Sequence, residues 1–323
     1  MTGARAGRKL RIGTRGSALA LWQTHHVRDR LLAIEPGVDI EIVVIQTTGD
    51  RVTDVALSRI GDKGLFTREL DRAVMDGDVD LAVHSLKDVP TTPAAGLDIA
   101  AVLERIDPRD ALVVAPGMPR TLMELPPRAT VGTSSLRRRA QLLALRPDLI
   151  VEDLRGNLDT RLRRVENGDY HAVILAFAGM RRLQFDARIA ETLDPPDWLP
   201  AAGQGALAIA TRTGDAVVAD IVGRLDHPPT RAATTAERAF LGALEGGCQI
   251  PIGALAVVED SLRLDGLVAS IDGTAVVRGS VHGTAANAAL LGRSLAQQLL
   301  DHGADRILAD LRAQNGAPRP ASP

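Results

Sequence analysis

The stretch LRIGTRGSALALWQTHHVRDRLLAIEPGVDIEIVVIQT, residues 10–47, decides the fold class of this chain. Its pattern predicts a short strand over Leu10 to Thr14, a helix over Ser17 to Ile34 and a β-branched strand over Ile40 to Thr47. A strand, a helix and a second strand in this order form a βαβ unit. The N-terminal part of the chain is therefore predicted to be an α/β domain.

The same alternation continues through the first two thirds of the sequence. Short apolar runs of the length of buried parallel strands recur at 81–84, 111–115, 129–132, 150–154 and 172–175, with helical segments between several of them. The last third differs. It predicts a helix over 232–244, hairpin-like strands over 254–258, 262–270 and 275–281, and a long helix from Ala285. We therefore expect a separate small α+β domain there.

Length and charge are those of an ordinary enzyme. The 323 residues suffice for two or three domains, and 38 basic against 40 acidic residues leave a net charge of −2. Aromatic residues are too sparse for stacking nucleic-acid bases, and no segment is apolar over the roughly 20 residues of a membrane span. We expect a cytoplasmic monomer that binds neither nucleic acid nor membrane, with a disordered tail over 315–323.

Two common kinds of site have no motif in this chain. The seven histidines lack the spacing of metal ligands, and neither GxxxxGK[ST] nor GxGxxG occurs. The sequence therefore predicts neither a metal site nor a glycine-rich nucleotide site.

Cys248 is the single cysteine of the sequence and lies in the segment GGCQIPIG, residues 246–253. A lone thiol cannot form an intramolecular disulfide, so it serves packing, nucleophilic chemistry or covalent attachment of another group. Without context, a small buried hydrophobic residue is the more frequent role. The flanking glycines and Pro251 instead predict an accessible loop, and covalent attachment is the role we favour.

Positive charge gathers in one segment, where nine arginines and four acidic residues lie between Arg128 and Arg164. Such a run is either a solvated face or a site for a polyanion. We assign Arg139, Arg163 and Arg164 to the solvated face.

Arg137 and Arg138 differ, because they fall in the first turn of a predicted helix whose N-cap is within Thr133-Ser134-Ser135. A cation there opposes the helix dipole unless an anion is bound. Hydroxyl groups, free backbone N–H groups and guanidinium groups at one helix start predict a carboxylate or phosphate site. The arrangement recurs at Arg15-Gly16-Ser17 and at Arg155-Gly156-Asn157, which leads into a helix carrying Arg161.

The segment HSLKDVP, residues 84–90, ends a predicted strand and so places Lys87 and Asp88 where ligands of open α/β sheets bind. Asp88 is the candidate for acid–base or cation-stabilising chemistry. Its alternative role is to cap a turn before Pro90. The glycine-containing loop 49–64 is predicted to be a mobile lid that ends at Lys63 and Phe66.

Seven motifs together resemble the porphobilinogen deaminase, or hydroxymethylbilane synthase, family over about residues 10–311. In this sequence they are TRGSALA (14–20), KGLF (63–66), HSLKDVP (84–90), VGTSSLRR (131–138), LRGN (154–157), GQG (203–205) and EGGCQIPIG (245–253). The resemblance implies a transferase of tetrapyrrole and heme biosynthesis. Such an enzyme joins four porphobilinogen molecules head to tail, releases ammonia, and primes the chain on a dipyrromethane cofactor, here bound through a thioether to Cys248.

The resemblance also implies three domains. Domain 1 comprises residues 1–104 and 204–224, domain 2 comprises residues 105–203, and both are expected to be shaped like the lobes of a periplasmic binding protein. Domain 3 comprises residues 225–314 and carries the cofactor cysteine.

The site residues implied by the resemblance fall into three groups. Asp88 is the catalytic residue. The cofactor is expected to contact Cys248, Ser85, Lys87, Asp88, Thr133, Ser134, Ser135, Arg137, Arg138, Arg155 and Gly156. The substrate is expected to contact Arg15, Ser17, Lys63, Phe66, Arg155, Asn157, Arg161, Arg182 and Gln204. Asp62 and Gly16 depart from the residues that the family more usually has at these places.

Charge explains why these residue types suit that chemistry. Each porphobilinogen carries an acetate and a propionate, so a growing chain is a polyanion that arginines can hold. The reacting centre becomes electron-poor as ammonia leaves, and a carboxylate such as Asp88 stabilises it. The alternative is a non-catalytic two-lobed binding protein or sensor domain for a carboxylate ligand. Cys248 and Asp88, with no export signal or DNA-binding helix pair recognised, favour the enzyme.

Overall fold

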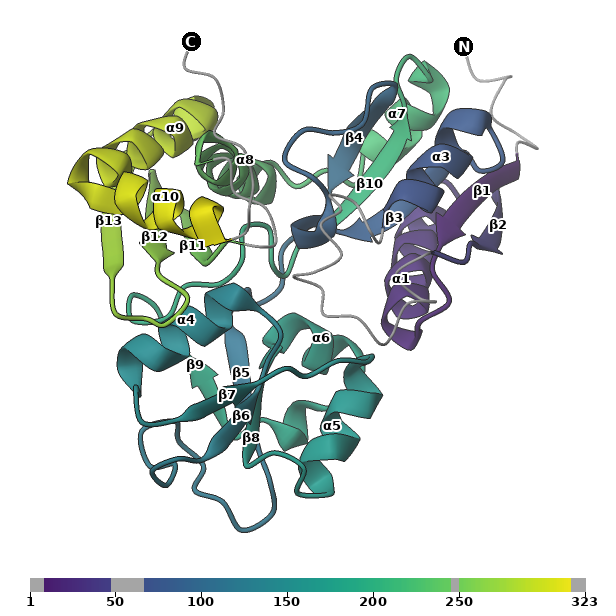
Figure 1. Ribbon diagram of the computed structural model, residues 1–323. Coiled ribbons are helices and arrows are strands. Elements are labelled where there is room, and N and C mark those ends of the chain that lie inside the picture. Colours follow the sequence, from purple (N-terminus) through teal and green to yellow (C-terminus); the bar gives the residue numbers. More distant parts are fainter. Residues whose placement is uncertain (1–8, 48–66, 245–249, 315–323) are drawn as a thin grey trace.

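The computed structural model describes residues 9–47, 67–244 and 250–314, and these form three sheets in three domains (Figure 1). We call the domain around the first sheet lobe 1, the domain around the second sheet lobe 2, and the C-terminal domain domain 3. The predicted fold class, two α/β lobes and a small α+β domain, is confirmed. Within the described ranges, none of the helices is long and apolar enough to cross a bilayer.

Lobe 1 is built on a five-stranded sheet of order β2-β1-β3-β10-β4. Its elements are β1 (Lys9–Thr14), α1 (Ala18–Ile34), β2 (Asp39–Val44), α3 (Arg68–Asp76), β3 (Leu81–Ser85), the 3-10 turn η2 (Leu86–Asp88), β4 (Leu97–Val102), β10 (Leu207–Arg212) and α7 (Ala216–Gly223). β1 pairs in parallel with β2 and β3, so the predicted βαβ unit is confirmed. Ile12, Val27 and Ile221 belong to the buried core that joins the sheet to α1 and α7.

Lobe 2 is built on a second five-stranded sheet, of order β7-β6-β8-β5-β9. Its elements are β5 (Asp110–Val114), β6 (Thr130–Gly132), α4 (Leu136–Leu145), β7 (Ile150–Glu152), α5 (Leu158–Glu166), β8 (Ala172–Ala176), α6 (Phe177–Arg182), the 3-10 turn η3 (Asp186–Arg188) and β9 (Glu191–Leu193). β6 is parallel to β7 and β8.

The prediction of a parallel strand at 111–115 was wrong in direction, because β5 runs antiparallel to β8 and β9. A central strand is buried on both faces whichever way it runs, so an apolar run does not encode its direction. β10 is its counterpart in lobe 1, antiparallel to β3 and β4.

The chain passes between the lobes over residues 103–109 and again over 194–206. The strands β4, β9 and β10 lie outside the predicted runs.

Domain 3 packs helices on a three-stranded antiparallel sheet of order β11-β12-β13. Its elements are α8 (Pro228–Ala243), β11 (Ile252–Val258), β12 (Leu262–Ala269), β13 (Val276–Gly283), η4 (Ala285–Asn287), α9 (Ala288–Leu299), the π-helical turn η5 (Leu300–Ala304) and α10 (Asp305–Gln314). The predicted single long helix from Ala285 is interrupted, because Gly303 has a left-handed φ of 102°. Gly292 lets α9 approach α8, since a Cβ there would lie 2.3 Å from the Ala236 carbonyl oxygen.

β10, which follows lobe 2 in the sequence, belongs to the sheet of lobe 1, so the chain returns to lobe 1 before it enters domain 3. The family-based boundaries at 104/105, 203/204 and 224/225 stay predictions. The predicted tail over 315–323 lies outside the described residues.

Candidate active site

Lys87 and Asp88 lie where the chain leaves the sheet of lobe 1 at the end of β3. Ser85 closes the strand, and its Oγ accepts a hydrogen bond from Gln23 Nε2 on α1 at 2.9 Å. Leu86 is buried, and its N–H donates at 3.0 Å to a carbonyl of the segment that returns from lobe 2. The start of η2 is therefore fixed, and Lys87 and Asp88 follow it directly.

The turn around Asp88 is closed by backbone atoms, because the Val89 N–H donates to the Leu86 carbonyl oxygen at 3.1 Å. The turn-capping alternative requires the Asp88 carboxylate to accept a hydrogen bond, and none of the described residues donates one to it. Asp88 is partly exposed. Its carboxylate thus has capacity for a ligand.

Lys87 joins lobe 1 to the crossing segment, since its Nζ donates to Gln204 Oε1 at 3.3 Å. The pKa of Lys87 is lowered to about 8, chiefly by burial. Asp88 and Asp110 act to raise it, and Arg138 and Arg137 of lobe 2 act to lower it. Arg137, which lies 50 positions after Lys87 in the sequence, is thus close enough for its charge to affect the pKa of Lys87.

The start of α4 is held by the hydroxyl groups that the sequence predicts there. Ser135 is the N-cap, with its Oγ accepting from the Arg138 N–H at 3.4 Å. Thr133 Oγ1 accepts from the Ser135 N–H at 3.2 Å, and Ser134 Oγ donates to the Leu154 carbonyl at 3.0 Å. The predicted N-cap is confirmed.

Arg137 and Arg138 have an anion beside them, and it belongs to the protein. Both side chains are buried, and their guanidinium groups lie 2.7 Å from the carboxylate of Asp110 at the start of β5. Burial raises the pKa of Asp110, but the two arginines outweigh it and hold that pKa well below its usual range. The anion predicted beside Arg137 and Arg138 is therefore, at least in part, the Asp110 carboxylate and not a ligand.

Arg155 has no such partner among the described residues. Its Nε and Nη2 atoms are buried, and no hydrogen bond to them is found among the described residues. Leaving buried N–H donors without an acceptor is costly, so this arrangement favours an anionic ligand. Gly156 follows in a left-handed conformation with a φ of 104°, and Asn157 caps α5 by accepting from the Thr160 N–H at 3.0 Å.

Arg161 on α5 lies in the same field as Arg155 and Asp88. Its Nε donates to the Gly156 carbonyl at 2.8 Å. The pKa of Arg161 is lowered to about 10, chiefly by burial and also by the charges of Arg138 and Arg155, while Asp88 acts to raise it. Four arginines of lobe 2 and the Asp88 carboxylate of lobe 1 are thus brought together.

The remaining predicted contacts lie along the junction of the two lobes. Ser17 caps α1 by accepting from the Ala20 N–H at 3.3 Å. Arg15 adjoins the end of β3, where its charge lowers the pKa of His84 after the larger effect of burial. Arg182 of lobe 2 donates from Nη2 to the Gly205 carbonyl at 2.8 Å, and burial lowers its pKa to about 10.

Several predictions fall on residues that the structure does not describe. These are the cofactor attachment at Cys248, the contacts of Lys63 and Phe66, and the lid over 49–64. Of the three arginines assigned to a solvated face, Arg163 is exposed and Arg164 is ion-paired with Asp169 at 3.0 Å in an accessible position. Arg139 is more buried than expected and donates to the Val151 carbonyl at 3.1 Å.

Three further residues support the site and were not predicted. Asp110 is the first. Glu237 of α8 is the second, wholly buried and paired with Arg105 at 2.6 Å. The third is Arg238, which donates to the Val89 and Pro90 carbonyls directly after Asp88 at 2.8 and 2.6 Å. The sequence did contain a signal for Asp110, because it is a single acidic residue at the start of the apolar strand β5, and a buried acid requires partners.

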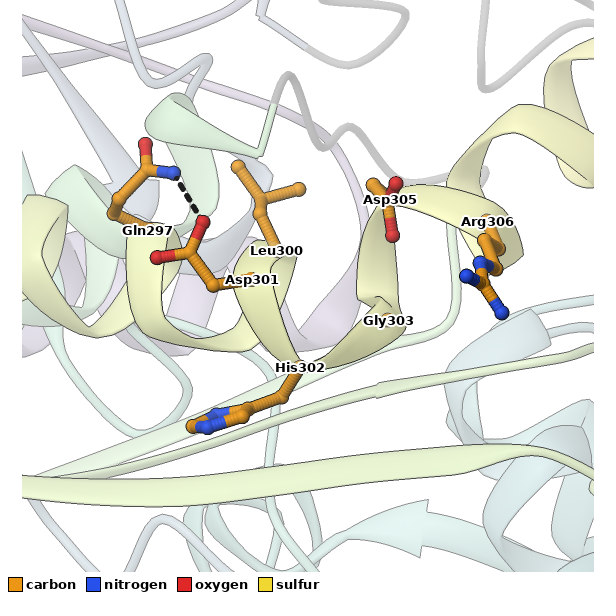
Figure 2. Close-up of a pocket in the computed structure, with 7 residues that line it drawn as sticks. All are labelled: Gln297, Leu300, Asp301, His302, Gly303, Asp305 and Arg306. Atoms are coloured by element: carbon orange, nitrogen blue, oxygen red, sulfur yellow. Dashed lines mark hydrogen bonds between the residues drawn. The ribbon is translucent and has the colours of Figure 1, made fainter.

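A separate hollow at the turn between α9 and α10 contains none of these residues (Figure 2). Two of its polar lining residues are hydrogen-bonded to each other, because Gln297 Nε2 donates to Asp301 Oδ1 at 2.8 Å. The hollow lies on domain 3, and none of the residues that line it belongs to the arginine cluster.

The fold and the site together define a two-lobed α/β protein with a cluster of arginines in lobe 2 that lies near two carboxylates, the buried Asp110 and the partly exposed Asp88. Comparison with known proteins identifies the family within this class. The family model described as "Porphobilinogen deaminase, dipyromethane cofactor binding domain" matches residues 10–220, and "Porphobilinogen deaminase, C-terminal domain" matches residues 232–301. The chain belongs to the porphobilinogen deaminase family, transferases of tetrapyrrole biosynthesis with a dipyrromethane cofactor.

Individual relatives agree over nearly the whole chain. A porphobilinogen deaminase of Moorella thermoacetica is 50% identical over 309 residues, 95% of this chain and 98% of its own. One of Roseiflexus castenholzii is 51% identical over 301 residues, 93% of this chain and 98% of its own. Among solved structures, the effector binding domain of BenM with benzoate matches 69% of this chain and 97% of its own at 12% identity, with a TM-score of 0.43.

The residues present fit a dipyrromethane. Its acetate and propionate groups are anions, and Arg155 offers two buried donor atoms without a partner among the described residues. Arg161 lies in the same field, and Thr133 to Ser135 surround the neighbouring helix start. Arg137 keeps Nε and Nη2 free of hydrogen bonds within the described part of the chain.

Proposed function

We propose that this chain joins four porphobilinogen molecules head to tail into hydroxymethylbilane, with Cys248 holding a dipyrromethane through a thioether. The observation that carries the proposal is that Nε and Nη2 of Arg155 are buried without a hydrogen-bond partner among the described residues, while the charge of Arg155 acts on Arg161 together with that of Asp88. When bound, the dipyrromethane supplies the primer from which the product grows. Arg155 and Arg161 bind substrate carboxylates, with Arg137 and Arg138 beside them.

Asp88 is the catalytic residue in this proposal. As the carbon–nitrogen bond of porphobilinogen breaks and ammonia leaves, positive charge develops on the substrate pyrrole, and the Asp88 carboxylate stabilises it. A new carbon–carbon bond then forms, and the pyrrole carbon that made it loses a proton, which Asp88 can accept. Lys87 and the arginines hold the carboxylate groups of the substrate away from this centre.

The remaining contacts are proposed in the same way. Ser85, Lys87, Thr133, Ser134, Ser135 and Gly156 contact the cofactor, and Arg15, Ser17, Lys63, Phe66, Asn157, Arg182 and Gln204 contact substrate or product chain. The near balance of charge and the scarcity of aromatic residues support a protein that binds no nucleic acid. In this proposal it acts as a cytoplasmic monomer. The domain boundaries are those of residues 1–104 with 204–224, 105–203 and 225–314.

Intact mass of the purified protein tests the proposal. The parent chain is expected to exceed its sequence mass by one dipyrromethane, and Cys248→Ser is expected to match its sequence mass and form no bilane. Porphobilinogen added to the parent should produce heavier covalent species in steps of one pyrrole unit. A parent protein at its sequence mass that binds a carboxylate ligand without consuming porphobilinogen would point to the binding-protein alternative.

A further inference from the structure

Asp110 is a carboxylate that the proposed reaction does not use directly, yet it lies at the centre of the site. It is wholly buried and accepts five hydrogen bonds, three from α4 and two from the chain crossing over residues 194–206. Oδ1 accepts from Nε and Nη2 of Arg138 at 3.2 and 2.7 Å and from Gln204 Nε2 at 2.8 Å. Oδ2 accepts from Arg137 Nη1 at 2.7 Å and from Trp198 Nε1 at 2.8 Å. A carboxylate has about four lone-pair sites, so its capacity is used fully.

These contacts fix the direction of both arginines. Arg137 Nη1 also donates to the Leu199 carbonyl at 2.7 Å, and Arg138 Nη1 donates to the Ile174 carbonyl at 2.9 Å. Each guanidinium is therefore held at two points, one of which is Asp110. Without the carboxylate, two adjacent cations would face each other in a buried place, where like charges repel strongly.

The same carboxylate connects the arginine pair to lobe 1. The Gln204 amide donates to Asp110 and accepts from Lys87 Nζ, so one side chain on the crossing segment links the two. Asp88 is the next residue after Lys87. A chain of hydrogen bonds thus runs from the catalytic segment of lobe 1, through the crossing, to the arginines of lobe 2.

We propose that Asp110 is a positioning residue, which sets the orientation of Arg137 and Arg138 and their register with Lys87 and Asp88 across the two lobes. The inference rests on the proposed function. Buried ion pairs add little to stability compared with apolar packing, so a fully satisfied pair among predicted ligand contacts favours a role in geometry. Asp110 itself makes no contact with substrate in this scheme.

The test compares Asp110→Asn with a matched buried carboxylate outside the site. Asp80 is 5% exposed, accepts from the Arg11 side chain at 3.2 and 3.3 Å, and lies within lobe 1. Asp80→Asn is expected to lower stability and leave cofactor content, kcat and KM of the folded protein unchanged. Asp110→Asn is expected to lower kcat roughly ten- to a hundredfold through misplaced contacts and to accumulate incomplete covalent chains by intact mass.

The outcomes separate this inference from the function it rests on. A parent chain without a dipyrromethane overturns the proposed function. A loaded parent with an Asp110→Asn variant that matches Asp80→Asn in kcat, KM and mass pattern overturns the positioning role alone. If Asp110→Asn does not fold, Trp198→Phe tests the positioning role instead. This variant removes one hydrogen-bond donor to Asp110 Oδ2 and keeps the negative charge of Asp110. It is expected to lower kcat roughly two- to tenfold with the same incomplete chains. Parent-like elongation by that variant overturns the role of Asp110.

Discussion

Lys87 Nζ of lobe 1 lies 3.3 Å from Oε1 of Gln204, and the amide nitrogen of the same Gln204 lies 2.8 Å from Asp110 of lobe 2. The polar contact between the lobes therefore passes through a lysine whose pKa is lowered to about 8. A lysine that loses its proton near this pH is a weaker partner for carboxylates. The site is thus expected to respond to pH in a range where ordinary lysines do not.

The first prediction concerns substrate affinity between pH 7 and 9. As pH rises through about 8, Lys87 loses its charge, so KM for porphobilinogen is expected to rise. Lys87→Arg keeps most of the charge over this range, because an arginine holds its proton more tightly than a lysine and even the buried Arg161 and Arg182 have pKa values of about 10. Its KM should therefore follow a flatter profile, measured by initial rates. Changes shared by both proteins belong to the substrate or to other groups, and identical profiles would rule out Lys87 as the titrating residue.

The same pKa gives a stability prediction with a definite sign. The folded pKa of about 8 lies below the unfolded value of 10.5, so the folded chain binds fewer protons between these values. The contribution of Lys87 to the free energy of unfolding should therefore rise as pH increases from about 8 to 10.5. Denaturant titrations of the parent and of Lys87→Met measure it, and the parent should gain unfolding free energy relative to Lys87→Met over that range. A constant difference would contradict the lowered pKa.

Asp88→Asn tests the catalytic carboxylate. The variant keeps the shape of the side chain and loses its negative charge. Stabilisation of developing charge in a partly desolvated site is worth about 3–4 kcal/mol, which corresponds to a rate loss of roughly 10² to 10³. Cofactor should still assemble at least in part, as read by intact mass. Near-normal turnover would mean that the carboxylate is not needed for the chemistry.

The sequence predicted the elements around the site better than the partners of its side chains. The βαβ unit over 10–47 and the N-cap at Ser135 follow from local patterns, and both are confirmed. The direction of β5 depends on the chain crossing from lobe 1, which no local pattern records. The interruption at Gly303 was missed because an apolar helical pattern continues on both sides of it.

Arg137 shows the same limit at the level of one residue. A cation in the first turn of a helix correctly predicts a nearby anion, but local sequence does not say whether that anion is a ligand or Asp110, 27 positions earlier. Arg155 precedes the N-cap of α5, where an anion site was also predicted, and its Nε and Nη2 have no such partner among the described residues. Only the three-dimensional arrangement distinguishes these two arginines.

Gly156 allows a prediction about backbone strain next to Arg155. Its φ of 104° is unfavourable for other residues, and a Cβ there would lie 2.8 Å from Thr160 Cγ2. Gly168 has a φ of 79° and no atom within 4 Å of such a Cβ. Gly168→Ala should cost about 1 kcal/mol of unfolding free energy through its backbone alone, and Gly156→Ala clearly more. Chemical denaturation measures both, and equal losses would show that the loop relaxes around Thr160.

The last prediction compares arginines that carry the same charge in different surroundings. Lysine preserves the charge but not the planar pair of donors, so arginine-to-lysine variants test geometry. Arg155→Lys and Arg137→Lys are both expected to impair cofactor loading or elongation, with incomplete covalent chains visible by mass. Arg164→Lys is the control, because Arg164 is accessible, pairs with Asp169 and lies over the Tyr170 ring at 4.8 Å.

The structure sharpens the expected difference between Arg137 and Arg155. Arg137→Lys also weakens the contact with Asp110, so its unfolding free energy should fall together with its activity. Arg155 donates to no described residue from Nε and Nη2, so Arg155→Lys should lose activity with little loss of stability in the cofactor-free protein. That protein is obtained in the Cys248→Ser background, where ligand binding cannot add to stability. Equal and mild effects at Arg137, Arg155 and Arg164 would instead mean that the cluster acts only as a diffuse positive field.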